Sequence, residues 1–247
     1  MTKLNDVAQN AREDEIDKLF VNSPSTSEVI VDLPSKGKFY NNFNGVRVTT
    51  LLFEDEQKIL SAKNRGSNMV NDLIAKCMTG VNINDLLAMD KLAILLKIKE
   101  ISYGSEMKFE ATCPLCNESA NVSIDVNDIP VVPIPDDFED PREVMLPVLK
   151  VKVKVRFPRN SEEFYFSDVD SAITNLYRFI TEIDGKTDPV FISKVFKKLH
   201  IRDNKTIVKA IHRTEFGLSP EFEYQCLKCK GSSTVGIPLD ASFFSVN

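Results

Sequence analysis

Phe109-Glu-Ala-Thr-Cys-Pro-Leu-Cys-Asn-Glu-Ser-Ala-Asn-Val-Ser-Ile124 is followed, 113 residues later, by a second version of itself, Phe222-Glu-Tyr-Gln-Cys-Leu-Lys-Cys-Lys-Gly-Ser-Ser-Thr-Val-Gly-Ile237. In both segments a Cys-x-x-Cys knuckle lies between two runs of residues that favour β-strands. The two knuckles contain four of the five cysteines of the chain. The positions that carry the same residue at this offset are Phe109, Glu110, Cys113, Cys116, Ser119, Val122 and Ile124, matched by Phe222, Glu223, Cys226, Cys229, Ser232, Val235 and Ile237.

The four knuckle cysteines have the spacing of a structural zinc site. One Cys-x-x-Cys pair supplies two thiolates, and a closed tetrahedral zinc site needs four. The spacing therefore predicts one structural Zn2+ per chain, bound by Cys113, Cys116, Cys226 and Cys229. Such a site has no open position for catalysis, and its binding free energy would join two segments that are far apart in the sequence.

Two other interpretations of the knuckles stay open. The site could be vestigial and bind no metal, or Cys113-Pro-Leu-Cys116 could be a redox-active dithiol. The duplicate knuckle and the strand-knuckle-strand setting argue against the dithiol, because redox pairs of this type lie at a helix N-terminus. In the cytosol thiols stay reduced, so paired cysteines there favour metal over a disulfide.

The similarity between the two segments extends upstream of the knuckles. Because a helix, a glycine, a strand, a knuckle and a second strand recur in one order, the sequence predicts an α+β fold with an internal duplication. Its two related helix-plus-β-hairpin halves would be joined by a split zinc-ribbon-like four-cysteine site. The further matches at the same offset are Leu86, Asp90, Ile94, Ile98 and Gly104 with Leu199, Asp203, Ile207, Ile211 and Gly217, while Tyr103 aligns with Phe216.

Composition shifts divide the chain into four predicted parts. Residues 1–27 form an amphipathic, charged N-terminal arm followed by a Ser/Thr-rich linker. Residues 28–128 are the first repeat with its zinc knuckle, and residues 148–247 are the second. Residues 129–147 are a Pro-rich connector, whose run at 129–141 is extended, acidic and punctuated by proline.

Hydrophobic periodicity and capping residues predict the individual elements. Strands are expected at 29–33, 46–53, 107–112, 120–126 and 149–157. The helix that begins at Asp85 is apolar on most of its faces, so it should be buried between layers. Cys77 lies in the helix before it and should be a core thiol. The remaining helices are expected at 54–64, at 68–78, from Ser167 to about Glu182, from Asp188-Pro189 onward, and from Asn204 to Glu215.

Composition excludes several classes of function. The chain has 247 residues, 43% of them hydrophobic, which is ordinary for a protein with a packed core. No apolar run is long enough for a membrane span, and no apolar signal region follows Met1. The nine glycines form no phosphate-binding loop, there are only two histidines, and no nucleophile motif occurs. We therefore expect no enzymatic activity.

One basic stretch gives the main alternative function. Residues 186–213 carry eight Lys or Arg and only two Asp, and Lys228 and Lys230 add charge at the second knuckle. Because zinc ribbons often bind nucleic acid, the chain could be a zinc-ribbon nucleic-acid-binding protein of a phage late program. The net charge of −5 and the lack of interleaved aromatic residues make nucleic acid an unlikely partner. The same lysines could equally be the solvated faces of two helices, or could face an acidic protein.

Three short motifs resemble the T-even bacteriophage baseplate protein family. They are Leu33-Pro-Ser-Lys-Gly-Lys-Phe-Tyr40, Lys99-Glu-Ile-Ser-Tyr-Gly104 and Cys113-Pro-Leu-Cys116, and the resemblance extends from about residue 28 onward. It implies a late phage protein of the host cytoplasm that helps to build the hub of the tail baseplate. It also implies an assembly factor or chaperone that binds hub or tape-measure proteins, and that could remain in the baseplate of the virion. The family supplies no catalytic residues to carry over.

Three segments are candidate contact surfaces for such partners. The arm at 1–20 and the connector at 129–141 are extended and lie outside the repeated units. The third is the turn that contains Lys36, Lys38, Phe39 and Tyr40, if its aromatic side chains are exposed. The alternative for this turn is that its two aromatic rings pack against the sheet.

Overall fold

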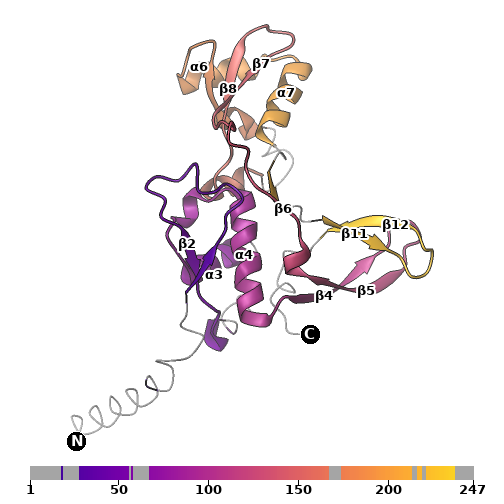
Figure 1. The fold of residues 1–247 in the computed structure, drawn as a ribbon. Helices are drawn as coiled ribbons and strands as arrows, with labels where there is room; N and C mark the ends of the chain where they lie inside the picture. Colours follow the sequence, from indigo (N-terminus) through magenta and orange to yellow (C-terminus); the bar gives the residue numbers. More distant parts are fainter. Residues whose placement is uncertain are drawn as a thin grey trace, which may run out of the picture.

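The computed structural model describes residues 28–55, 67–166, 174–212, 216–218 and 221–236, with the single residues 18 and 57. The predicted arm at 1–27 therefore lies outside the described residues, apart from Lys18, and so does most of the helix predicted at 54–64. The fold is α+β, with short helices and five small antiparallel sheets (Figure 1). This part of the predicted fold class is confirmed.

The first lobe is a three-stranded meander packed against two helices. Its strands are β1 (Val29–Val31), β2 (Val46–Val48) and β3 (Met78–Thr79), hydrogen-bonded in that order. Helices α3 (Ser67–Cys77) and α4 (Ala88–Tyr103) cover the sheet, and η2 (Ile83–Asp85) connects them. Cys77 is buried in this core, as predicted. Helix α4 buries residues on most of its faces, as its sequence predicts: Asp90, Leu92, Ile94, Leu95, Leu96, Ile98 and Lys99.

The second lobe has the same kind of architecture. Strands β7 (Arg142–Met145), β8 (Lys152–Val155) and β9 (Ile180–Ile183) form a meander, with α6 (Pro189–Phe196) against β9 and α7 (Ile201–Ile211) against β7 and β8. The alternation in β8 places Val153 and Val155 in the core. Its lysines pair with carboxylates of the neighbouring strands, Lys152 with Glu143 and Lys154 with Glu182.

The helix predicted from Ser167 to Glu182 is wrong at its C-terminal end. Residues 176–179 form the short 3-10 helix η5 (Leu176–Phe179), and the next four residues are β9. Ile180 and Ile183 are buried in the second core, and β9 hydrogen-bonds to β8. Tertiary pairing therefore overrides the local helical pattern. The start of the helix predicted from Asp188 is confirmed, because Asp188 caps α6 and Pro189 is its first residue.

The predicted connector is packed rather than free. Its residues include η3 (Val126–Asp128) at the start and β6 (Val131–Val132), which pairs with β10 (Gly217–Leu218). Ile134 and Phe138 are buried between the lobes, where Phe138 stacks on Phe157 with ring centroids 5.7 Å apart. The Nζ of Lys38 donates to the carbonyl oxygens of Asp136 and Phe138. The connector thus forms the core that joins the two lobes.

Two β-hairpins complete the molecule. They are β4 (Glu106–Thr112) with β5 (Ser119–Asp125), and β11 (Glu221–Gln225) with β12 (Ser232–Gly236). Figure 1 shows them projecting together beside the lower end of α4, although one follows the first lobe and the other the second. None of the described helices is both long and apolar enough to cross a membrane.

Candidate metal centre

Each hairpin is connected to a helix whose first turn is anchored by a buried aspartate. In α4 the carboxylate of Asp90 accepts from the backbone N–H of Ser35 (3.0 Å) and from the hydroxyl of Tyr40 (2.5 Å). In α7 the carboxylate of Asp203 accepts from the backbone N–H groups of Val148 (2.7 Å) and Leu149 (3.1 Å). Both aspartates are essentially inaccessible to solvent, at 0% and 1% exposure. These contacts fix each helix to the loop that precedes the middle strand of its own sheet.

The sequence matches these aspartates but does not reveal what they do. A detectable signal lies in their partners, because Ser35 and Val148 are also 113 residues apart and each follows a Leu-Pro pair. Tyr40 is held inside by Asp90 and by the N–H of Leu87, which donates to its hydroxyl. The turn at 36–40 therefore packs its aromatic rings inward, which is the second of the two predicted alternatives.

The two hairpins have the same register. Phe109 lies opposite Val122 and Thr112 opposite Ser119 in the first hairpin. The same pairs, shifted by 113 residues, are formed in the second: Phe222 opposite Val235 and Gln225 opposite Ser232. The sequence similarity at the knuckles therefore corresponds to equal strand pairing, and each knuckle begins at the same point of its ladder.

The knuckle turns are closed by equivalent backbone hydrogen bonds. The N–H of Cys113 donates to the carbonyl oxygen of Glu118 (2.8 Å), and the N–H of Asn117 donates to that of Cys113 (2.8 Å). Asn117 takes a left-handed conformation with φ of 56°, as does Lys230 with φ of 59°. The corresponding bonds of the second knuckle run from Cys226 to Gly231 (3.0 Å) and from Lys230 to Cys226 (2.9 Å).

The four predicted cysteines meet at one point, with all their Sγ atoms within 4.8 Å of one another. The Sγ of Cys113 lies 3.9 Å from that of Cys229, and the Sγ of Cys116 lies 3.7 Å from that of Cys226. A regular tetrahedron with zinc–sulfur bonds of about 2.3 Å has sulfurs about 3.8 Å apart. A disulfide would need about 2.05 Å, and all these cysteines are free thiols. The cluster therefore has the dimensions of a four-thiolate metal site.

Sulfur contacts between the knuckles are reciprocal. The first cysteine of each knuckle contacts the second cysteine of the other, which is the pattern of a two-fold interface. Phe109 and Phe222, equivalent residues, meet edge to face with centroids 5.7 Å apart. Across the tips, Lys228 is paired with Glu118. The hairpins thus meet through equivalent surfaces, with the cysteines at the centre.

The electrostatics of the cluster favour a bound cation. The backbone N–H groups of Cys229 and Lys228 point at the Cys226 sulfur and lower its pKa to about 6. At Cys116 the backbone N–H of Glu118 lowers the pKa, but desolvation and the three neighbouring sulfurs outweigh it and raise the pKa to about 12. Four thiols this close therefore cannot all ionise in isolation. A divalent cation at their centre would remove the mutual repulsion of the thiolates.

Burial of the four sulfurs is uneven. Cys113 and Cys226 are buried, Cys116 is half-buried and Cys229 is exposed. Each pair lies in the turn of a β-hairpin and not at the N-terminus of a helix, which removes the geometry that activates redox dithiols. The fifth cysteine, Cys77, is in the first lobe and takes no part in the cluster.

Fold and cysteine cluster together define an α+β protein with a ribbon-like four-cysteine centre. The family model for the T4 bacteriophage base plate protein matches residues 26–245. Since this match covers most of the sequence, the chain belongs to that family of phage baseplate proteins, and the predicted resemblance is confirmed. No curated protein and no solved structure gives a significant match to the chain.

Proposed function

We propose that the protein is an assembly factor for the hub of the phage tail baseplate, acting through protein–protein binding without covalent chemistry. The observation that carries this proposal is the family match over residues 26–245, together with a centre whose four sulfurs leave no open coordination position. Its partners are other baseplate proteins, among them hub or tape-measure proteins. It acts in the host cytoplasm and could stay in the virion.

The metal is zinc, and its role is structural. Four thiolates in a tetrahedral arrangement select zinc or an iron–sulfur centre, and the spacing of the sulfurs corresponds to one ion. Cys113 and Cys116 would hold it from the first hairpin, and Cys226 and Cys229 from the second. Since each hairpin is only two-stranded, metal binding supplies stability that an isolated hairpin lacks.

We also infer that the two halves arose by internal duplication. The supporting features all fall at one offset: the buried aspartates Asp90 and Asp203, the helices that begin at Ala88 and Ile201, and the two hairpin registers. Gly104 and Gly217 both have positive φ angles, of 93° and 120°. Chance similarity of two Cys-x-x-Cys motifs would not extend to hydrogen-bond partners as distant as Ser35 and Val148.

Affinity purification from infected cells tests the proposed function. Tagged full-length protein should recover baseplate hub or tape-measure proteins, identified by mass spectrometry. A deletion of residues 1–20 should weaken this recovery while leaving the thermal unfolding midpoint unchanged, if the arm contacts partners. Recovery of nucleic acid instead, lost at high salt and on reversal of the charges of Lys194, Lys197, Lys198 and Lys209, would favour the nucleic-acid-binding alternative.

A further inference from the structure

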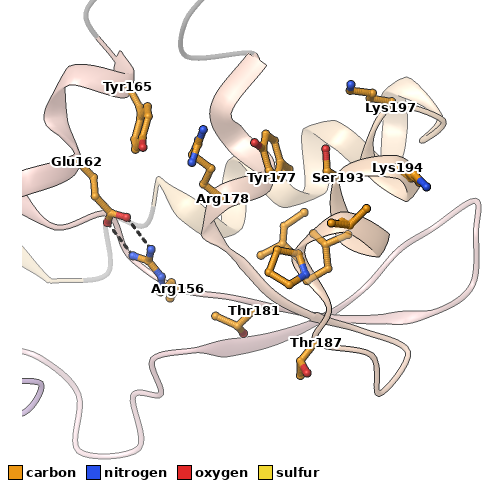
Figure 2. Close-up of a pocket in the computed structure, with 14 residues that line it drawn as sticks. Arg156, Glu162, Tyr165, Tyr177, Arg178, Thr181, Thr187, Ser193, Lys194 and Lys197 are labelled. Carbon is orange, nitrogen blue, oxygen red and sulfur yellow. Dashed lines mark hydrogen bonds and ion pairs between the residues drawn. The ribbon is translucent and has the colours of Figure 1, made fainter.

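A basin of about 770 Å3 lies in the second lobe, away from the cysteines (Figure 2). Its walls are η4 (Asn160–Phe166), η5, β9 and α6. Its volume is within the range of ligand-binding clefts, and it combines apolar residues such as Ile192 with several cations. Neither the zinc centre nor the shared core accounts for this combination.

The guanidinium of Arg178 is held in a fixed orientation inside the basin. Figure 2 shows it between the rings of Tyr165 and Tyr177, whose centroids are 4.5 Å and 5.4 Å from its central carbon. Each ring is supported by a second one, Tyr165 by Phe164 and Tyr177 by Phe196. Such stacking pre-orients the guanidinium and removes part of its hydration shell.

The terminal nitrogens of Arg178 remain available to a ligand. Its Nε donates to the side-chain oxygen of Asn175 (3.0 Å), and among the described residues its two Nη groups have no acceptor. Two parallel N–H groups of this kind bind a carboxylate in a bidentate manner. The orientation of Arg178 is therefore that of a carboxylate receptor whose partner is external.

Two more cations extend the positive wall of the basin. Lys194 and Lys197 lie on α6, are exposed, and form no ion pair within the described part of the chain. Arg156, also in the basin, differs because Glu162 already neutralises it through two hydrogen bonds of 2.8 Å and 2.7 Å. The basin therefore keeps three uncompensated positive charges beside one closed ion pair.

We propose that this basin is a docking site for an acidic segment of a partner protein, with Arg178 binding one of its carboxylates and Lys194 and Lys197 lying beside others. This inference deepens the proposed function and rests on it, since the partner would be a baseplate protein. The cations are local, whereas the chain as a whole has a net charge of −5. That balance disfavours a long nucleic acid, which needs an extended positive surface, and suits a short acidic peptide segment.

Charge reversal tests the site against a matched control. The variant Arg178→Glu/Lys194→Glu/Lys197→Glu changes exposed side chains, so the fold should be kept, which the thermal midpoint and circular dichroism would verify. The control Arg202→Glu/Lys205→Glu/Lys209→Glu makes the same change of charge on exposed positions of α7, outside the basin. Recovery of the baseplate partner from infected cells should fall by about tenfold or more in the first variant and stay within about twofold in the control.

Two further measurements sharpen the test. Arg178→Lys keeps the charge but loses the planar pair of donors, so recovery should fall by roughly threefold to tenfold. A photo-cross-linking residue at Thr187, exposed at the rim of the basin, should attach to a segment of the partner rich in Asp and Glu. The same residue placed at Lys205 should give no such product.

The outcomes separate this proposal from the proposed function. If the wild-type protein recovers baseplate proteins but the basin variant recovers them equally well, the docking site is wrong and the assembly role stands. A cross-link from Thr187 to nucleic acid, or to a segment without carboxylates, also overturns the docking site. If even the wild-type protein recovers no baseplate protein, the assembly role itself fails.

Discussion

The first and second halves of the chain share their fixed points but differ between them. Both contain a three-stranded meander, a helix anchored by a buried aspartate and a hairpin that carries two cysteines. Between meander and hairpin the first half places α3 against α4, whereas the second places η5 and α6 around an open basin. The equivalent parts are those that hold the hairpins together, and the parts that differ are free to bind partners.

The largest effect should come from removing either pair of cysteines. Because one ion needs ligands from both halves, Cys113→Ser/Cys116→Ser and Cys226→Ser/Cys229→Ser should each abolish metal binding. Apparent binding free energies of structural zinc are roughly 10–16 kcal/mol, so both variants should lose the hairpin structure to a similar extent. Zinc content and hydrogen exchange of the hairpin amides would measure this. Cys77→Ala, which leaves the cluster intact, should keep full metal content, and a metal-bound pair variant would break the equivalence of the halves.

The buried aspartates should respond next, and unequally. At Asp203 both donors are backbone N–H groups, so the NH2 of an asparagine would face a donor, and Asp203→Asn should cost about 2–3 kcal/mol. At Asp90 one donor is the Tyr40 hydroxyl, which can also accept, so Asp90→Asn should cost only about 1 kcal/mol. Urea denaturation gives both values. A larger loss at Asp90 than at Asp203 would show that the two anchors are not understood.

The paired glycines provide a smaller test. Gly104→Ala and Gly217→Ala both place a side chain at positive φ, which should cost about 1–2 kcal/mol. At Gly217 the added Cβ would also lie 3.0 Å from the Cβ of Met89, whereas nothing is within 4 Å at Gly104. We therefore expect the loss of unfolding free energy to be greater at Gly217. Equal losses would mean that Met89 moves aside without resistance.

The smallest effect should be a pH dependence that belongs to the first anchor. Burial raises the pKa of Asp90 above its ordinary value, against the hydrogen bonds from Ser35 and Tyr40 that lower it. The folded state therefore binds this proton more tightly than the unfolded chain does. Its contribution to stability is complete below the unfolded pKa of about 3.9 and is lost as the pH rises through the folded pKa. The unfolding free energy of the wild type relative to Asp90→Asn should thus decline with increasing pH, and an increase would contradict the assignment.

The cysteine cluster could be predicted because its signal is local and repeated. One offset aligns both knuckles, and zinc chemistry then requires the four thiols to meet, as they do. The buried helix α4 and the cap of α6 were equally readable, from hydrophobic pattern and from Asp188-Pro189. These features depend on residues close together in the sequence.

The features that the sequence did not reveal depend on distant contacts. Strand β9 was predicted as helix because its partner β8 lies more than twenty residues away, although Ile180 and Ile183 fit a strand. Burial of the connector depends on Phe157 and Phe216, which only tertiary packing brings to Phe138. The stacked Arg178 arises from residues of separate elements, Tyr165 and Tyr177, so no motif could indicate it.

The most direct test of the central claim is metal analysis combined with X-ray absorption on the purified full-length protein. If one ion joins the two halves, the protein should contain one zinc per chain, with four sulfur neighbours at about 2.3 Å. A zinc content far below one per chain, or a shell with only two sulfurs, would mean that the two knuckles do not share an ion.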